Sequence, residues 1–301
     1  MKTITLARYD AFADVPGMGN PCGVVLEADG LSGEEMQQLA FQAGFSECAF
    51  ICRSEKADLR LRFFMPGRET PLCGHGTVCA FSALMARQAP AAPLTLRAET
   101  LAGELELGYD PATRMVSMEQ APARFEPFEG DLEGLLGAIG LDKTALDTRF
   151  PVVYGSTGSW TVILPIRTLE DFRKMQPQNK LFPGLLTAHP GASVHPLCLE
   201  TLSPDCQLHG RHFSAGDSGV TEDPVTGTAC GVMGAYWLAY IAPGETRADL
   251  FIEQGQEMGR DGHVRVRACR REGQIQVKIA GRAVRPSSTW GTLCTNLENW
   301  L

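Results

Sequence analysis

One short motif occurs twice in this 301-residue chain, and it constrains the fold more than any other feature of the sequence. The pattern E-x-P-x-x-G fills residues 69–74 and recurs at residues 222–227, so the two copies are 153 positions apart. Both copies follow an Arg-x-Phe triplet, which begins at Arg62 and at Arg211. A repeat at this separation predicts a chain built from two related halves.

Each copy of the motif opens an apolar segment, at residues 74–87 and 229–241. Apolar side chains occur almost all the way round both segments, which predicts helices that are buried on every side. A further helix is predicted over residues 32–43, where Ser32 and Glu35 form a capping box. The alternating segments that we predict as strands are residues 3–9, 24–27, 47–52, 58–64, 263–271, 274–284 and 289–294.

Two buried helices, each entered through a glycine turn and surrounded by strands, indicate a duplicated α+β fold. The first domain is predicted at residues 1–118 and the second at residues 119–285, with a proline-rich crossover at residues 121–130. A C-terminal strand within residues 286–301 is expected to pack back on the first domain. The expected place for a ligand is a cleft between the two halves.

The composition excludes several classes of partner. The chain is 44% hydrophobic with a net charge of −8 and has no long cluster of Lys and Arg, which argues against nucleic acid and membranes and favours a small molecule. It has no apparent targeting segment and no apolar run long enough to cross a bilayer, so a cytoplasmic location is predicted. Ten cysteines without a C-x-x-C pair fit neither a zinc ribbon nor a disulfide framework, and most are expected to be buried thiols.

The two glycine-initiated helices suggest a site for an anion. The first N–H groups of a helix have no partner within the helix and carry a positive partial charge, so they can hold a carboxylate. Gly74 and Gly227 would allow a ligand to approach the backbone closely. The alternative is that both glycines only close tight turns, but their occurrence in both copies of the repeat favours a binding role.

Cys73 and His75 flank the start of the first of these helices. A lone histidine without a second ligand at helical spacing makes a metal site improbable, and His75 is either a core residue or a neutral hydrogen-bonding partner of a substrate. Cys73 is either a small buried thiol or a low-pKa base. A racemase with two thiols would need a second one in the other half, where Val225 and Thr226 stand instead.

Two carboxylates are candidates for acid–base chemistry. Glu47 opens an apolar strand just after a helix, where burial would raise the pKa of a carboxyl group toward the range that a general acid or base needs. Asp223 lies inside the second copy of the motif. The alternatives are a solvated glutamate at the edge of a strand, and an aspartate that stabilises the start of a helix.

Five motifs in order and spacing resemble the phenazine-biosynthesis PhzF-like family, within the diaminopimelate-epimerase fold, over nearly the whole chain. The motifs are residues 19–25 (GNPCGVV), Ser46-Glu47, residues 62–66 (RFFMP), residues 73–77 (CGHGT) and residues 222–229 (EDPVTGTA). The resemblance implies two pseudosymmetric domains, each a curved, mostly antiparallel sheet or barrel around a central buried helix. It also implies a homodimer without cofactor or metal.

The resemblance further implies an isomerase that moves a proton between carbons of a small carboxylic acid. Glu47 takes the position of the family's acid/base, and His75 and Asp223 fall where polar residues of that family contact the substrate. Gly76 stands where the family often has Ala or Pro, and Thr228 where it often has Ser, which bears on the identity of the substrate. The remaining positions that the resemblance assigns to substrate binding are Asn20, Ser46, Gly74, Gly76, Gly227 and Thr228.

The function predicted from the sequence is therefore a cofactor-independent isomerase in which Glu47 removes a proton from carbon and returns it. Two alternatives remain open. One is a racemase or epimerase that uses Cys73, and the other is a protein that binds a small acid without catalysing a reaction.

Overall fold

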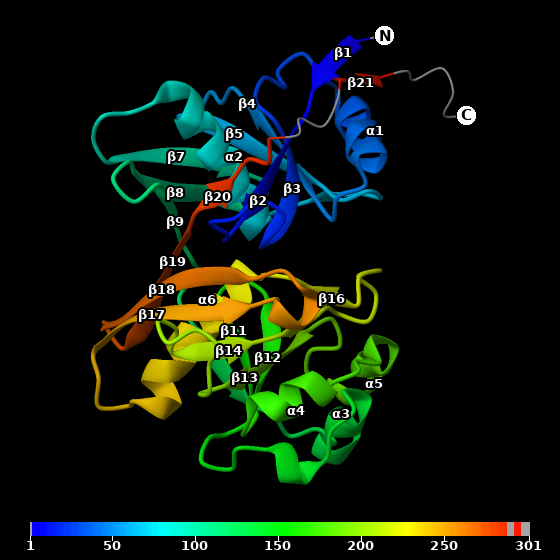
Figure 1. The fold of residues 1–301 in the computed structure, drawn as a ribbon, viewed down its shortest axis with the longest axis vertical. Coiled ribbons are helices and arrows are strands. Elements are labelled where there is room, and N and C mark those ends of the chain that lie inside the picture. The colour runs from blue at the N-terminus through cyan, green and yellow to red at the C-terminus, as the bar shows by residue number, and fades with distance from the viewer. Residues whose placement is uncertain (1, 288–291, 296–301) are drawn as a thin grey trace. The chain divides into compact units, whose positions relative to one another are not determined.

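The computed structural model describes residues 2–287 and 292–295 of the chain (Figure 1). The chain divides into two compact units. The first unit contains the chain up to Glu119 and from Ala280 onward, and the second runs from Gln120 to Ile279. Parts of the predicted C-terminal strand segment, residues 288–291 and 296–301, lie outside the described residues.

The first unit is a mostly antiparallel set of strands around one helix. Helix α2 (Gly74–Gln88) packs against β2, β3, β4 and β9, and ten of its fifteen residues are buried. Strand β3 pairs with β4 in parallel, as β5 does with β7, and the other printed pairings of this unit are antiparallel. The strands of this unit are β1 (Lys2–Thr5), β2 (Ala7–Ala11), β3 (Asn20–Val25), β4 (Cys48–Cys52), β5 (Leu59–Phe64), β6 (Glu69–Thr70), β7 (Leu94–Thr100), β8 (Gly103–Asp110), β9 (Met115–Glu119), β20 (Ala283–Val284) and β21 (Thr292–Thr295).

Helix α1 (Gly33–Ala43) begins where the sequence predicts. The hydroxyl of Ser32 accepts a hydrogen bond from the Glu35 N–H at 3.2 Å, and the Glu35 carboxylate accepts one from the Ser32 N–H at 2.8 Å. The helix ends at Gly44, whose φ of 68° is a left-handed conformation that glycine adopts without strain. The capping box and the predicted helix are therefore confirmed.

The second unit also surrounds one buried helix, α6 (Gly227–Tyr236), which packs against β11, β17 and β18. A single π-helical segment, Trp237–Ile241, follows it. Parallel pairings join β12 to β13 and β14 to β17. The strands are β10 (Arg124–Pro127), β11 (Val153–Ser156), β12 (Trp160–Pro165), β13 (Ser193–Cys198), β14 (Leu208–Gly210), β15 (His212–Phe213), β16 (Glu222–Asp223), β17 (Arg247–Gln254), β18 (Gly262–Arg271) and β19 (Gln274–Gly281), of which the last crosses into the first unit.

Short helices that the sequence did not predict cover part of the second unit. Their apolar residues, including Phe172 and Phe182, join strands β11 to β13 in one hydrophobic core. None of the helices within residues 2–287 is long and apolar enough to cross a membrane. The added elements are α3 (Leu132–Ala138), α4 (Leu169–Lys174), α5 (Phe182–Leu185) and the 3-10 turns Lys143–Ala145, Asn179–Leu181 and Gln256–Met258.

The two copies of the sequence repeat have the same local structure. Arg62 makes a two-pronged ion pair with Glu69, at 2.7 and 2.8 Å, and Arg211 makes the same pair with Glu222 at 2.8 and 2.7 Å. Each guanidinium also lies over the phenylalanine two positions later, at 5.0 and 4.9 Å from the ring centre. The repeat therefore specifies equivalent strand pairs, β5–β6 and β15–β16, ahead of the two buried helices.

Three predicted strands differ from the structure. The strand predicted at residues 274–284 is interrupted at Arg282, between β19 and β20. The strand predicted at residues 3–9 is split at Leu6 into β1 and β2, and Leu6 itself is buried in the core beside α1. The strand predicted at residues 24–27 begins at Asn20, within a glycine- and proline-rich segment that reads as a loop. Pairing of β3 with β2, from Ala11–Asn20 to Ala7–Val24, imposes the extended conformation there.

Candidate active site

Glu47 lies between the end of α1 and the start of β4. Its backbone carbonyl accepts a hydrogen bond from the N–H of Gly23 on β3 at 3.4 Å, which fixes the residue just before the first residue of β4. The side chain is 19% exposed. The side chain is therefore partly shielded, which favours the acid/base interpretation over that of a solvated glutamate at the edge of a strand.

Cys73 and His75 open helix α2. Cys73 is the N-cap residue, and its sulfur accepts a hydrogen bond from the Gly76 N–H at 3.2 Å. The carbonyl of Cys73 accepts from both the N–H and the hydroxyl of Thr77, at 2.9 and 2.7 Å. These bonds hold the first turn of α2, and with it His75, in one conformation.

The structure brings Glu47, Cys73 and His75 together. The His75 Nε2 atom lies 3.5 Å from a carboxylate oxygen of Glu47, and its Nδ1 atom lies 3.4 Å from the sulfur of Cys73. His75 is only 7% exposed. A carboxylate beside an imidazole and a thiol can take up, hold and return a proton. The spacing of these residues in the sequence gave no sign that Glu47 would meet the other two.

The same three side chains offer ligand atoms that lie within 4.8 Å of one another, as do those of Cys206, Glu253 and His263. The second group is already engaged, because the Glu253 carboxylate accepts hydrogen bonds from two backbone N–H groups and from His209. The expectation that the protein holds no metal stays a prediction.

The start of α2 leaves little space for a side chain at Gly76. A β-carbon at Gly76 would lie 2.9 Å from the sulfur of Cys73 and 3.2 Å from the ring of Phe63. The glycine at this position therefore makes room for the cap formed by Cys73. Gly74 is the first residue of the helix and is partly exposed.

Two other predicted residues belong to the same unit. Asn20 is buried at the first residue of β3, three positions before the glycine that binds the Glu47 carbonyl. Ser46 is partly exposed and precedes Glu47 in the chain. Their predicted contacts with a substrate stay predictions.

Asp223 lies in the second unit, at the end of β16. Its carboxylate accepts a short hydrogen bond from the hydroxyl of Thr226, the N-cap residue of α6. This hydroxyl is therefore turned away from the helix, which has no side-chain cap. The first turn of α6 thus differs from that of α2, where Cys73 supplies the cap.

Gln254 is a residue of this region that the sequence analysis missed. Its side-chain amide donates to the Asp223 carbonyl at 2.8 Å and accepts from the Thr226 N–H at 3.2 Å, and it is 1% exposed. It comes from the end of β17, far along the chain, so no local pattern marks it. The adjacent Gly255 has a φ of 97°, and a β-carbon there would lie 2.7 Å from the carbonyl of Pro224.

Gly227 and Thr228 are the first two residues of α6. Gly227 is buried, Thr228 is partly exposed, and the Thr228 carbonyl accepts a hydrogen bond from Thr157 at 3.1 Å. The nearest thiol, Cys230, is fully buried, and burial together with the charge of Asp223 raises its pKa far above the usual range. This thiol is therefore protonated at neutral pH and is not a second base.

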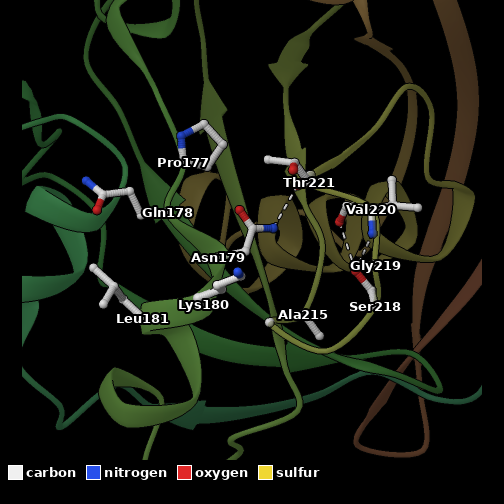
Figure 2. A pocket seen from close by; sticks show the side chains of 11 residues that line it. Pro177, Gln178, Asn179, Lys180, Leu181, Ala215, Ser218, Gly219, Val220 and Thr221 are labelled. Carbon is white, nitrogen blue, oxygen red and sulfur yellow. Dashed lines mark hydrogen bonds between the residues drawn. The ribbon is translucent and has the colours of Figure 1, made fainter.

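A pocket of about 460 Å³ lies beside the loop that joins β15 to β16 (Figure 2). It is lined by residues 177–181 and by the loop of residues 215–221, and none of the predicted site residues lines it. The amide of Asn179 donates to the carbonyls of Ser214 and Thr221, at 2.6 and 2.7 Å, and so ties the two ends of this loop together. Asn179 therefore fixes the hairpin that carries Asp223.

Comparison with known proteins supports the resemblance seen in the sequence. The family model for phenazine biosynthesis-like proteins (PhzC-PhzF) matches residues 9–288. The crystal structure of a PhzF-family phenazine biosynthesis protein from Bacillus anthracis is 46% identical, with a TM-score of 0.91 over 95% of this chain and 97% of that one. The predicted resemblance is thus confirmed, and the fold is that of PhzF-family proteins.

Curated relatives carry the names of isomerases. The uncharacterized isomerase YfhB of Bacillus subtilis (strain 168) is 46% identical over 94% of this chain and 97% of its own length. The trans-2,3-dihydro-3-hydroxyanthranilate isomerase of Pseudomonas aeruginosa is 31% identical over 86% of this chain and 88% of its own length. The chain therefore belongs to the phenazine biosynthesis-like (PhzC-PhzF) family and is related over nearly its whole length to isomerases.

Proposed function

We propose that the protein is a cofactor-independent isomerase that moves a proton between two carbons of a small carboxylic acid, with Glu47 as the acid/base. The observation that carries the proposal is the shielded Glu47 carboxylate held 3.5 Å from the imidazole of His75. The side chain is only partly exposed, so Glu47 is held where it can keep a proton between its removal from one carbon and its delivery to another, and it can still exchange that proton with solvent.

The reaction needs the Glu47 carboxylate and a group that stabilises the negative charge that develops on the substrate. Glu47 removes a proton from one carbon of the substrate, and the electrons of the C–H bond shift into the neighbouring π system. The protonated Glu47 then delivers its proton to a carbon further along that system, which moves the double bond. His75 hydrogen-bonds to Glu47 or to the substrate and stabilises the charge that develops during transfer.

The substrate carboxylate is proposed to bind at the first turn of α6, through the N–H groups that follow Gly227 and Thr228. Two features support this choice over α2. The N-cap hydroxyl of Thr226 is engaged by Asp223 and does not cap α6, whereas the sulfur of Cys73 already caps α2. An uncapped helix start carries unpaired donors and positive partial charge, which favour an anion.

The equivalent Arg–Glu pairs of the two repeats support a further proposal, that the two halves are pseudosymmetric domains of the diaminopimelate-epimerase type. The predicted cleft between the halves, the homodimer, the cytoplasmic location and the absence of a metal or cofactor stay predictions.

One observation favours a second candidate function. The sulfur of Cys73 lies 3.4 Å from His75 Nδ1, and a thiol beside an imidazole can become a base. A racemase that uses Cys73 would have the hydroxyl of Thr226 at the equivalent place in the other repeat. Such an enzyme would invert the α-carbon of an amino acid, which the proposed isomerase does not do.

The experiment that tests the proposal is a screen in deuterated water. The protein is incubated with a pool of small carboxylic acids that includes trans-2,3-dihydro-3-hydroxyanthranilate, the compound in the name of the P. aeruginosa relative. An isomerase returns a solvent deuteron to carbon, so one acid should gain one mass unit while its double bond moves. Inversion of an amino acid without such a shift would support the second candidate instead.

A further inference from the structure

Two histidines face each other beside Asp223 in the second unit. His195 on β13 is completely buried, and its Nδ1 atom lies 3.1 Å from the Nδ1 atom of His212 on β15. The ring centres are 5.3 Å apart, with the planes tilted by 54°. His212 is partly exposed, and it is the direct register partner of Asp223 across the β15–β16 pair. The proposed function does not use either histidine.

The first unit shows that packing does not require a histidine here. Phe63 is the register partner of Thr70 in the β5–β6 pair, as His212 is of Asp223. Phe63 is fully buried and lies against the start of α2. A phenylalanine therefore satisfies the packing of this strand position, and the second unit has replaced it with a side chain that can hydrogen-bond.

The surroundings of His195 determine where the protons of the pair lie. Its Nε2 atom is 2.9 Å from the sulfur of Met233, which has no proton to give. A β-carbon at Gly210 would lie 3.0 Å from the same nitrogen, so the glycine leaves room for this contact. The proton of a neutral His195 therefore resides on Nε2, and its Nδ1 accepts a hydrogen bond from His212.

Both rings are neutral near pH 7. Burial lowers the pKa of His195 well below its usual value, and the charges of His212 and His209 lower it further. Burial also lowers the pKa of His212, although the charge of Asp223 opposes this effect. A neutral His212 with its proton on Nδ1 has an unprotonated Nε2, and this atom is the one that remains for a ligand.

We propose that His212 is a substrate-contacting residue whose Nε2 accepts a hydrogen bond from a hydroxyl or amino group of the substrate, with His195 and Met233 fixing its tautomer. This rests on the proposed function in one respect, that Asp223 borders the substrate site. His212 thereby selects small carboxylic acids that carry a hydrogen-bond donor over those that lack one.

The test uses the full-length protein with ¹⁵N-labelled histidine at pH 7.5. The probes are anthranilate and benzoate, which differ only in the amino group. The Nε2 signal of His212 should be that of an unprotonated nitrogen and should move with anthranilate but not with benzoate. Anthranilate should bind about three- to tenfold more tightly than benzoate, because one net hydrogen bond typically raises affinity by about this factor.

Two variants sharpen the result. His212→Phe copies the residue of the first repeat and should bring the binding ratio of the two probes close to one. Met233→Leu should remove the preference of the histidine pair for one tautomer, so that part of the His212 population becomes protonated on Nε2. Met118→Leu, at another buried methionine, is the control and should leave the protonation of His212 unchanged. The second comparison remains informative if His212→Phe fails to fold.

Three results would overturn the proposal. They are a His212 protonated on Nε2 in the wild type, an Nε2 signal that anthranilate does not move, and an unchanged binding ratio in folded His212→Phe. Glu47→Gln separates this proposal from the proposed function, because it should lower turnover by roughly 10²- to 10⁴-fold while leaving the response of His212 to anthranilate intact.

Discussion

At the scale of single residues, the structure gives Cys73 a role that its position in the sequence left open. The sulfur caps α2 through the Gly76 N–H and contacts His75, so the residue holds the start of the helix and lies beside the candidate base. The sequence could show that a thiol precedes a helix and that no thiol stands opposite it in the repeat. It could not show the contact with His75, because the direction of a side chain depends on packing.

Serine in place of Cys73 separates the two candidate functions. Serine is a favoured N-cap residue, so Cys73→Ser should keep the cap, fold normally and retain isomerase activity within a few-fold of the wild type. Activity and thermal stability of the purified variant check this expectation. A folded Cys73→Ser protein that is inactive, together with inversion of an α-carbon by the wild type, would identify the thiol as a base.

At the scale of elements, the start of α6 depends on residues that are distant in the sequence. The repeat predicted the helix and its glycine, and α1 could be predicted because its capping signals are local. Gln254, which binds both Asp223 and Thr226, comes from β17 and carries no local signal. The short helices α3 to α5 were missed for a related reason, since their stability depends on packing in the core of the second unit.

Gln254→Leu tests whether this amide positions the Asp223 region. The change removes the hydrogen bonds that Gln254 makes with the Thr226 N–H and the Asp223 carbonyl, which are partly buried, so the free energy of unfolding should fall by roughly 1–3 kcal/mol. Activity measured on the fully folded fraction should fall as well. Gln207→Leu is the matched control, because Gln207 also binds backbone groups, including the N–H of Phe251 on β17, but lies away from Asp223. Equal activities of the two folded variants would contradict the positioning role.

At the scale of the whole molecule, the duplication was the most informative feature of the sequence, because it located both buried helices and both Arg–Glu pairs. A buried charged cluster was not predicted. His209, which is completely buried, binds Glu253 at 2.8 Å and Glu257 at 2.9 Å. Its partners are more than 40 positions away, so only the folded chain brings the three charges together.

This cluster predicts how stability depends on pH. Burial alone would lower the pKa of His209, but the hydrogen bonds to Glu253 and Glu257 outweigh it and raise that pKa. Burial would raise the pKa of both glutamates, but the hydrogen bonds to His209 lower them. The stabilisation is therefore complete between about pH 5 and pH 6.5, and it is lost as pH rises through the folded pKa of His209 or falls through those of the glutamates.

Urea unfolding of wild type and His209→Asn should show this dependence. At pH 6 the variant should be less stable than the wild type by roughly 3 kcal/mol, the usual cost of removing one partner from a buried ion pair. The difference should shrink at pH 9, where His209 is closer to neutral in the wild type. His189→Asn, at a partly exposed histidine that lies 2.8 Å from Glu126 and outside this cluster, is the control and should show a smaller change between the two pH values. A difference that stays constant from pH 6 to pH 9 would contradict the assignment of a charged His209.

The central claim is that Glu47 moves the proton, and the most direct measurement compares Glu47→Gln with the wild type on the acid that gains deuterium. Removal of a positioned acid/base should lower kcat by roughly 10²- to 10⁴-fold, while substrate binding and the folded structure are retained. Glu55→Gln, at an exposed glutamate, is the matched control and should keep full activity. A folded Glu47→Gln protein that still turns over this substrate at the rate of the wild type would contradict the claim.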